Sequence, residues 1–246
     1  MGTRELLTLN LAIVESALQV VPREIQSHPQ IRRYAERRMK KPEEVLLDRA
    51  FHNAAMHKLA RKGYHLPVER MGRPDIVHNT LLQVLETPLN WENKLRVFVH
   101  TQDDYVISIN PQIRLPKNYV RFVGLIEQLF SMGRVPERGD PLMQVEKNTL
   151  RKLADRLQAS DVVGFSTLGR SELLRNVTDL IGRSKEPLVC IGGFPRGHFS
   201  EETMRSLNST FKVDSESLDA WVVAGRFVYD FEWVIGVAQK RVKPET

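Results

Sequence analysis

The sequence LVCIGGFPRGHFS, residues Leu188 to Ser200, joins an apolar run to a glycine-rich loop. The run from Leu188 to Ile191 is too continuous for a strand with one solvated face, and it predicts a fully buried strand. Gly192 and Gly193 end this strand, and Gly197 follows. Glycines at the carboxyl end of a buried strand let the main chain approach a ligand closely. We therefore expect a cofactor held by main-chain loops, although an ordinary tight turn explains the glycines alone equally well.

Two further strand ends in the same half of the chain strengthen this expectation. The segment DVVGFS, 161–166, predicts a strand that ends in Thr167-Leu168-Gly169, and a helix capped by Ser171 is expected to follow it to Ile181. A short strand at 211–213 leads into a loop at 213–217 and a helix from about Leu218. The carboxyl ends of parallel strands meet at one edge of a sheet, so the three loops are expected to enclose an adenosine-sized ligand.

The loop is a poor match to the common phosphate-binding motifs. Gly192 and Gly197 have P-loop spacing, but His198 and Phe199 replace the Lys-Ser/Thr pair, and Pro195 lacks an N–H. The letters GGFPRG are not GxGxxG, and no acidic residue follows at the usual distance. The remaining candidate is a cofactor bound through its base, ribose and sulfonium.

The rest of the chain alternates strands with helices. This pattern predicts an α/β fold with a mainly parallel sheet, and no linker divides 1–246 into two domains. Strands are expected at Leu6 to Val14, Leu95 to Thr101 and Tyr105 to Ile109. Helices are expected from Pro42 to Gly63, from Ile76 to Glu86 with Asp75 as its cap, from Pro116 to Phe130, from Leu150 to Leu157, and from Ser200.

The composition narrows the class of protein. The 246 residues are 41% hydrophobic and 27% charged, which is typical of a soluble globular chain, and no apolar run is long enough to cross a membrane. The lone cysteine, Cys190, indicates a reducing cytoplasm. His52 and His57 do not have HExxH spacing and there are no cysteine pairs, so no metal is expected.

The charge indicates an anionic partner. The net charge of +6 favours nucleic acid before membrane. Six of the eleven residues in IRRYAERRMKK, 31–41, are Arg or Lys, although a solvated helix face is the commoner explanation of such a run.

Three segments resemble a known family: GRPDIVHNTLLQVLETPLN (72–90), VFVHTQDDYVISINPQIRLPKNYVRFVGLIEQLF (97–130) and IGGFPRGHF (191–199). They are similar to the small-subunit rRNA pseudouridine N(1)-methyltransferases, the Nep/Emg family, in their archaeal form. The resemblance implies a SPOUT-class fold with a C-terminal trefoil knot and family-type insertions, which departs from the usual absence of knots. It also implies S-adenosyl-L-methionine as cofactor, small-subunit (16S-type) rRNA as substrate, a homodimer, and a role in ribosome biogenesis beside ribosomal assembly proteins.

The same resemblance assigns roles to residues. In the RPDI motif it implies that Arg73 contacts RNA and that Asp75 steadies Arg73; further RNA contacts match Arg114, Lys117 and Arg121. The residues themselves agree, because Lys117 and Arg121 are four apart on an expected helix and Arg114 lies just before it. Such cations can bind phosphates, or form a surface salt-bridge cluster instead. The cofactor positions implied are Thr167, Leu168, Gly192, Gly197, Val213, Asp214, Ser215, Glu216, Ser217 and Leu218.

The chemistry of the implied reaction needs little from the protein. The pseudouridine ring N–H loses its proton as the nitrogen attacks the sulfonium methyl, so Arg73 can stabilise the developing anion. Asp75 is the only acid of the motif; we favour an orienting role, because a carboxylate paired with arginine is a feeble base. Two alternatives stay open: a non-catalytic RNA-binding assembly factor, and a SPOUT methyltransferase for another nucleotide.

Overall fold

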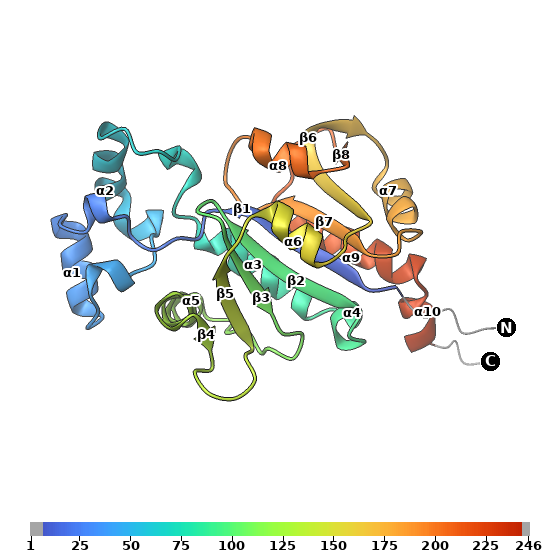
Figure 1. The fold of residues 1–246 in the computed structure, drawn as a ribbon, viewed down its shortest axis with the longest axis horizontal. Coiled ribbons are helices and arrows are strands. Elements are labelled where there is room, and N and C mark those ends of the chain that lie inside the picture. The colour runs from blue at the N-terminus through green and yellow to red at the C-terminus, as the bar shows by residue number, and fades with distance from the viewer. Residues whose placement is uncertain (1–6, 243–246) are drawn as a thin grey trace.

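A mixed eight-stranded sheet organises the part of the chain that the structure describes, residues 7–242 of a computed structural model (Figure 1). In sheet order its strands are β4 (Arg134–Val135), β5 (Met143–Lys147), β3 (Tyr105–Ile109), β2 (Leu95–Thr101), β1 (Leu9–Ser16), β7 (Pro187–Gly192), β6 (Asp161–Ser171) and β8 (Ser209–Lys212). The five from β2 to β8 pair in parallel, whereas β3, β5 and β4 pair antiparallel. The predicted α/β fold with a mainly parallel sheet is confirmed.

Helices cover both faces of this sheet. One face carries α3 (Pro74–Leu85), α4 (Pro88–Trp91), α5 (Tyr119–Met132), α7 (Leu174–Ile181), α9 (Ala220–Val234) and α10 (Val237–Arg241), and the other carries α6 (Leu150–Arg156) and α8 (Glu201–Ser206). In β7, Val189 and Ile191 pack into the first face while Leu188 and Cys190 pack into the second. Burial on both faces is why this strand reads as a continuous apolar run.

The only cysteine lies inside that run. Cys190 is fully buried, and burial raises the pKa of its thiol far above the usual range. A neutral, inaccessible thiol is expected to resist alkylation until the protein unfolds, which makes it an internal reporter of native packing.

A helical lobe projects beyond the sheet at the C-terminal end of β1 (Figure 1). It contains α1 (Pro29–Arg37), α2 (Arg49–Arg61) and three short 3₁₀ turns, η1 (Arg23–Ile25), η2 (Pro42–Glu44) and η3 (Val68–Arg70), around a separate apolar cluster. Buried Glu127 of α5 ties the lobe to the sheet, because its carboxylate accepts hydrogen bonds from Arg38 and Lys40 and from the Leu46 N–H.

Several helices begin later than predicted. The helix expected at Pro42 starts at Arg49, because 45–47 are extended and Asp48 provides the cap by accepting the Ala50 N–H. The helix expected at Pro116 starts at Tyr119, where Asn118 caps it through the Arg121 N–H. In both cases the capping side chain, rather than the proline, sets the first turn.

Two other caps were wrong. Ser171 is the last residue of β6 rather than a helix cap, because its strand pairing with Lys212 extends β6 and delays α7 to Leu174. Asp75 does not cap α3, which begins at Pro74, two residues before the expected start at Ile76. The carboxylate of Asp75 accepts hydrogen bonds from the Arg73 side chain instead. The strands expected at 95–101 and 105–109 are confirmed. The helix expected from Ser200 begins at Glu201, with Ser200 as its N-cap.

Four further expectations concern the start of the first strand, membrane-spanning helices, the number of domains and the knot. Leu6, the expected start of the first strand, lies outside the described residues, and β1 is seen from Leu9. Within residues 7–242, no helix combines the length and apolar content needed to cross a membrane. The assignment of 1–246 to a single domain stays a prediction, and so does the trefoil knot.

Candidate functional site

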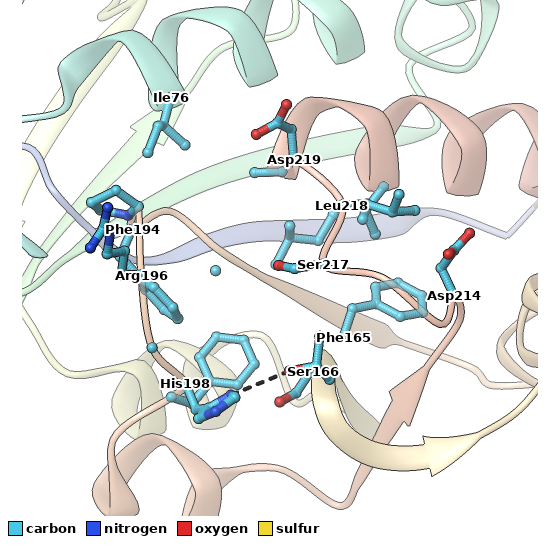
Figure 2. A pocket seen from close by; sticks show the side chains of 18 of the residues that line it. Ile76, Phe165, Ser166, Phe194, Arg196, His198, Asp214, Ser217, Leu218 and Asp219 are labelled. Atoms are coloured by element: carbon cyan, nitrogen blue, oxygen red, sulfur yellow. Dashed lines mark hydrogen bonds between the residues drawn. The ribbon is translucent and has the colours of Figure 1, made fainter.

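A cleft of about 220 Å³ lies at the carboxyl ends of β6, β7 and β8 (Figure 2). These strands are parallel neighbours, so the loops that follow them meet at one edge of the sheet, as expected. The start of α9 and the N-terminal turn of α3 complete its walls. The cleft is therefore formed by segments far apart in the sequence.

The walls combine apolar side chains with a few polar groups. The apolar part consists of Ile76, Phe165, Ile191, Phe194, Phe199, Phe211, Val213, Leu218, Trp221 and Val223. Hydroxyls of Ser166, Thr167 and Ser217 lie among them, and Thr167 is within 3.4 Å of a ring nitrogen of His198. An apolar wall with a small number of hydrogen-bonding groups suits a nucleoside-like ligand.

Most of the residues predicted to bind the cofactor lie around this cleft. Its lining includes Thr167, Gly192, Gly197, Val213, Asp214, Glu216, Ser217 and Leu218. Leu168 and Ser215 do not line it, and the Leu168 side chain is 67% exposed. Both are neighbours of lining residues in the sequence. They miss the cleft because successive residues of a loop point in different directions. Whether the lining residues bind a cofactor stays a prediction.

Gly169 shows how tightly the first loop is packed. After Phe165 the strand β6 bulges, and it then pairs again with β8, so that both Phe165 and Arg170 are partners of Phe211. A Cβ at Gly169 would lie 2.6 Å from the Phe211 nitrogen and 2.7 Å from the Thr210 carbonyl carbon. Only glycine allows the main chain to cross β8 at this distance.

An arginine–aspartate pair faces the same cleft. Arg73 stands at the N-cap of α3, and its Nε and Nη2 groups donate to the two carboxylate oxygens of Asp75 at 2.8 and 2.7 Å. The hydrogen bonds that Arg73 donates to Asp75 raise the pKa of Arg73, and the charge of Asp219 adds to this. Arg73 lines the cleft while Asp75 does not, so the geometry holds a fixed cation at its mouth.

Three charged residues of the cleft were missed from the sequence, and one of them is Lys212 at the end of β8. The other two lie outside the strands. Arg196 is exposed and lines the cleft beside Phe194, and Asp219 stands at the N-cap of α9 (Figure 2). Signals for both existed: Arg196 lies inside the glycine-rich loop, and Asp219 is a typical capping residue next to the second loop. Neither signal separates a ligand-facing side chain from one that faces solvent.

The predicted RNA contacts Arg114, Lys117 and Arg121 lie outside the cleft. All three are exposed, and none forms an ion pair within residues 7–242, so the surface salt-bridge cluster is not found there. Lys117 precedes α5, which makes the expected i, i+4 pair on one helix wrong.

These cations are nevertheless connected to the arginine–aspartate pair. Buried His78, on the same helix as Asp75, makes a 2.7 Å hydrogen bond to the Pro116 carbonyl, and Asn90 donates to the Pro111 carbonyl at 2.9 Å. The segment 111–118 is thereby fixed against α3 and α4.

The fold and the cleft define an α/β protein with a cleft at the carboxyl ends of its parallel strands, and a solved structure similar to it is that of a methyltransferase. The crystal structure of Archaeoglobus fulgidus Nep1 bound to S-adenosylhomocysteine matches with a TM-score of 0.79 and 34% identity, covering 94% of this chain and 99% of that one. S-Adenosylhomocysteine is what remains when S-adenosylmethionine has given up its methyl group.

Relatives found by sequence similarity identify the family of the chain. It is 43% identical over 228 residues to the ribosomal RNA small subunit methyltransferase Nep1 of Thermococcus onnurineus, covering 92% of this chain and all of the relative. The Pyrococcus furiosus protein of the same name is 40% identical over 227 residues, covering 92% and 97%. The family EMG1/NEP1 methyltransferase matches residues 11–232. The chain belongs to this family, and the resemblance found in its sequence is confirmed.

Proposed function

We propose that this protein transfers the methyl group of S-adenosyl-L-methionine to the ring N1 of a pseudouridine in small-subunit rRNA. Membership of the family and the S-adenosylhomocysteine held by the matching Nep1 structure support the reaction class and the cofactor. The observation that carries the proposal is the position of Arg73: a cation fixed by Asp75 lines the same cleft as the glycine-rich loops. A cofactor and an anionic target can therefore meet there.

The cleft fits the cofactor in chemical terms. Phe165, Phe211 and Leu218 offer apolar surface to a purine, and the hydroxyl of Ser217 and the carboxylates of Asp214 and Glu216 can accept hydrogen bonds from a ribose. Gly192 and Gly197 leave the main chain free of side chains where the loop borders the cleft. We propose that these residues hold the cofactor, which supplies an electrophilic methyl group on a sulfonium.

Arg73 and Asp75 have separate parts in this proposal. When the cofactor is bound, the target nitrogen would attack the methyl carbon as the sulfonium S–CH3 bond breaks, and the proton of the nitrogen would pass to solvent. The guanidinium of Arg73 would stabilise the negative charge that develops on the ring. Asp75 orients Arg73, because both of its oxygens already accept hydrogen bonds from that side chain. Positioning and electrostatics then provide most of the rate enhancement.

Calorimetric titration with S-adenosylmethionine, followed by methyl transfer to a loop RNA with either uridine or pseudouridine, tests the proposal. We expect binding, with transfer only to the pseudouridine RNA and at its N1. Transfer to uridine, or to another atom, would contradict the proposed target. Failure to bind the cofactor would favour the alternative of a non-catalytic RNA-binding factor in small-subunit assembly.

We propose that Arg114, Lys117 and Arg121 contact phosphates of the RNA. Their exposure and their lack of ion-pair partners within residues 7–242 leave the charges available. Replacing Arg114 or Arg121 by alanine is expected to lower the slope of log affinity against log salt by about one unit each, because fewer counterions are released.

The measurement is RNA binding by fluorescence anisotropy over a series of salt concentrations. Lys152→Ala is the matched control: this exposed cation lies on α6, which covers the other face of the sheet. An unchanged slope in Arg114→Ala and Arg121→Ala, or the same decrease in Lys152→Ala, would remove the two arginines from the RNA surface.

We also propose that the protein is a homodimer associated through α7 and α9. Their outer surface exposes large apolar side chains: Leu173, next to α7, together with Leu180, Val222, Tyr229 and Trp233. Exposed apolar side chains on two helices that pack together can form an interaction surface. Sedimentation equilibrium is expected to give twice the chain mass, and a monomer at micromolar concentration would contradict this proposal.

A further inference from the structure

Strand β1 ends in an unusual turn beside the cofactor cleft. Glu15 has a φ of 51°, a left-handed conformation that is uncommon for a residue other than glycine, and its side chain is buried. On either side of it, the Val14 carbonyl accepts the Gly193 N–H and the Ala17 N–H donates to the Gly193 carbonyl, at 2.8 and 2.9 Å. The turn is thus held against the start of the glycine-rich loop, with Glu15 directed at that loop.

We propose that Glu15 is a positioning residue whose carboxylate fixes both ends of the cleft-lining loop 194–200. Glu15 is not itself part of the cleft lining, so it would act through the loop rather than by touching the cofactor. The inference rests on the proposed function in one respect: the loop is taken to bind S-adenosylmethionine.

The first contact fixes the end of the loop. Glu15 Oε1 accepts the backbone N–H of Ser200 at 2.8 Å. Ser200 is the N-cap of α8 and follows Phe199, which is buried and lines the cleft. A carboxylate at the N-terminus of a helix is favourable because the free N–H groups there carry partial positive charge. This contact therefore sets where the loop joins α8.

The second contact fixes the start of the loop. Glu15 Oε2 binds Nη2 of Arg70 at 2.6 Å, and the guanidinium carbon of Arg70 lies 4.0 Å from the centre of the Phe194 ring. Phe194 lines the cleft and meets Phe199 edge-on, with ring centres 5.8 Å apart. One carboxylate is thereby connected to both aromatic side chains of the loop, through Arg70 at one end and Ser200 at the other.

Neighbouring groups hold this arrangement in place. Nε2 of Gln102 donates to the carbonyls of both Glu15 and Arg70, at 3.2 and 2.8 Å. The Glu15 N–H donates to Nδ1 of His100, whose other ring nitrogen is 3.1 Å from Asp104. A buried carboxylate is tolerated only when it is paired and hydrogen-bonded, and here each of its oxygens has a partner. Removing the charge would leave Arg70 without an ion-pair partner within residues 7–242.

The test is the affinity for S-adenosylmethionine in Glu15→Gln, measured by calorimetry on the full chain. Glutamine has the same shape and can still accept the Ser200 N–H, but it loses the ion pair with Arg70. We expect affinity to fall by about tenfold or more, because small displacements of positioning groups are costly. Glu202→Gln is the matched control: it removes an exposed carboxylate on α8 that has no ion pair within residues 7–242, and it should leave affinity unchanged.

A double-mutant cycle separates positioning from a general effect on folding. If Glu15 acts through Arg70 and Phe194, Glu15→Gln should have a much smaller effect on cofactor affinity in a Phe194→Leu background. Additive losses would contradict the proposal, as would unchanged affinity in the single variant. Protection of Cys190 from alkylation verifies that each variant is folded.

The outcomes also distinguish this proposal from the function on which it rests. If the unaltered protein binds no S-adenosylmethionine, the proposed function fails; if it binds and Glu15→Gln binds equally well, only the positioning role fails. Should Glu15→Gln not fold, the same cycle is made with Arg70→Gln, which keeps the Glu15 bond to Ser200. Additivity of Arg70→Gln with Phe194→Leu would then overturn the proposal.

Discussion

Arg73→Ala is expected to lower the rate of methyl transfer by about 10²- to 10³-fold, the usual cost of removing one preorganised group that stabilises transition-state charge. Arg73 lines the cleft, and two hydrogen bonds from its guanidinium to Asp75 fix its direction. Its loss leaves the apolar walls and the glycine-rich loop in place. Affinity for S-adenosylmethionine should therefore stay close to that of the unaltered protein.

Single-turnover transfer at saturating RNA, together with calorimetry for the cofactor, measures the two effects separately. Arg73→Lys is a useful companion because it keeps the charge but cannot form the two-pronged contact with Asp75, and it should be intermediate. A normal rate of Arg73→Ala at saturating RNA would contradict the expectation, since it would limit Arg73 to binding the substrate.

Asp75→Asn asks which part the carboxylate takes. An amide keeps one acceptor for Arg73 but cannot take up a proton, so an orienting Asp75 predicts a smaller loss of rate than in Arg73→Ala. If this variant lost activity while RNA affinity and the placement of Arg73 stayed intact, Asp75 would instead be the base.

Gly193→Ala is expected to destabilise the protein by about 1–3 kcal/mol and to abolish measurable cofactor binding. A Cβ at this position would lie 2.8 Å from Cγ2 of Ile13 and 2.9 Å from the Ser16 Cα, both on buried β1. The main chain of Gly193 also hydrogen-bonds on both sides of the Glu15 turn, so the clash must displace the loop or the strand. Neither can move without disturbing the cleft.

Thermal unfolding measures the first effect, with a decrease in Tm of about 2–4 °C for each kcal/mol in a chain of this size. Gly124→Ala is the matched control. Gly124 lies inside α5, and the nearest atom to an added Cβ is Nη2 of Arg38 at 3.9 Å. Alanine there should stabilise the helix by roughly 0.5–1 kcal/mol. A Gly193→Ala protein with unchanged Tm and cofactor affinity would contradict the packing argument.

The sequence predicted the sheet better than the ends of its helices. Val189 and Cys190 pack on opposite faces, and a strand buried on both sides leaves a continuous apolar run that is easily recognised. Helix starts depend on the capping residue, whereas the prediction relied on proline. Pro42 and Pro116 are each followed by a better capping residue, Asp48 and Asn118 respectively. Local preference predicted that each helix exists, and a hydrogen bond from a capping side chain to the first turn decided where it begins.

The site was predictable in its loops and less so in its side chains. Strand ends and glycines located the cleft, because parallel strands bring their carboxyl ends together. Arg196 was missed because nothing in a sequence shows which way a loop side chain points. Glu15 was missed for another reason: its importance depends on Arg70 and Ser200, which are 55 and 185 residues away along the chain.

The lengths of the outermost strands bear on how copies of this protein can associate. The sheet ends at β4, with two residues, and at β8, with four. Long free edges invite a strand of another chain to add to the sheet, which is a common start of aggregation. These edges offer few unpaired backbone groups to such a strand. Open-ended association by sheet extension is thus disfavoured.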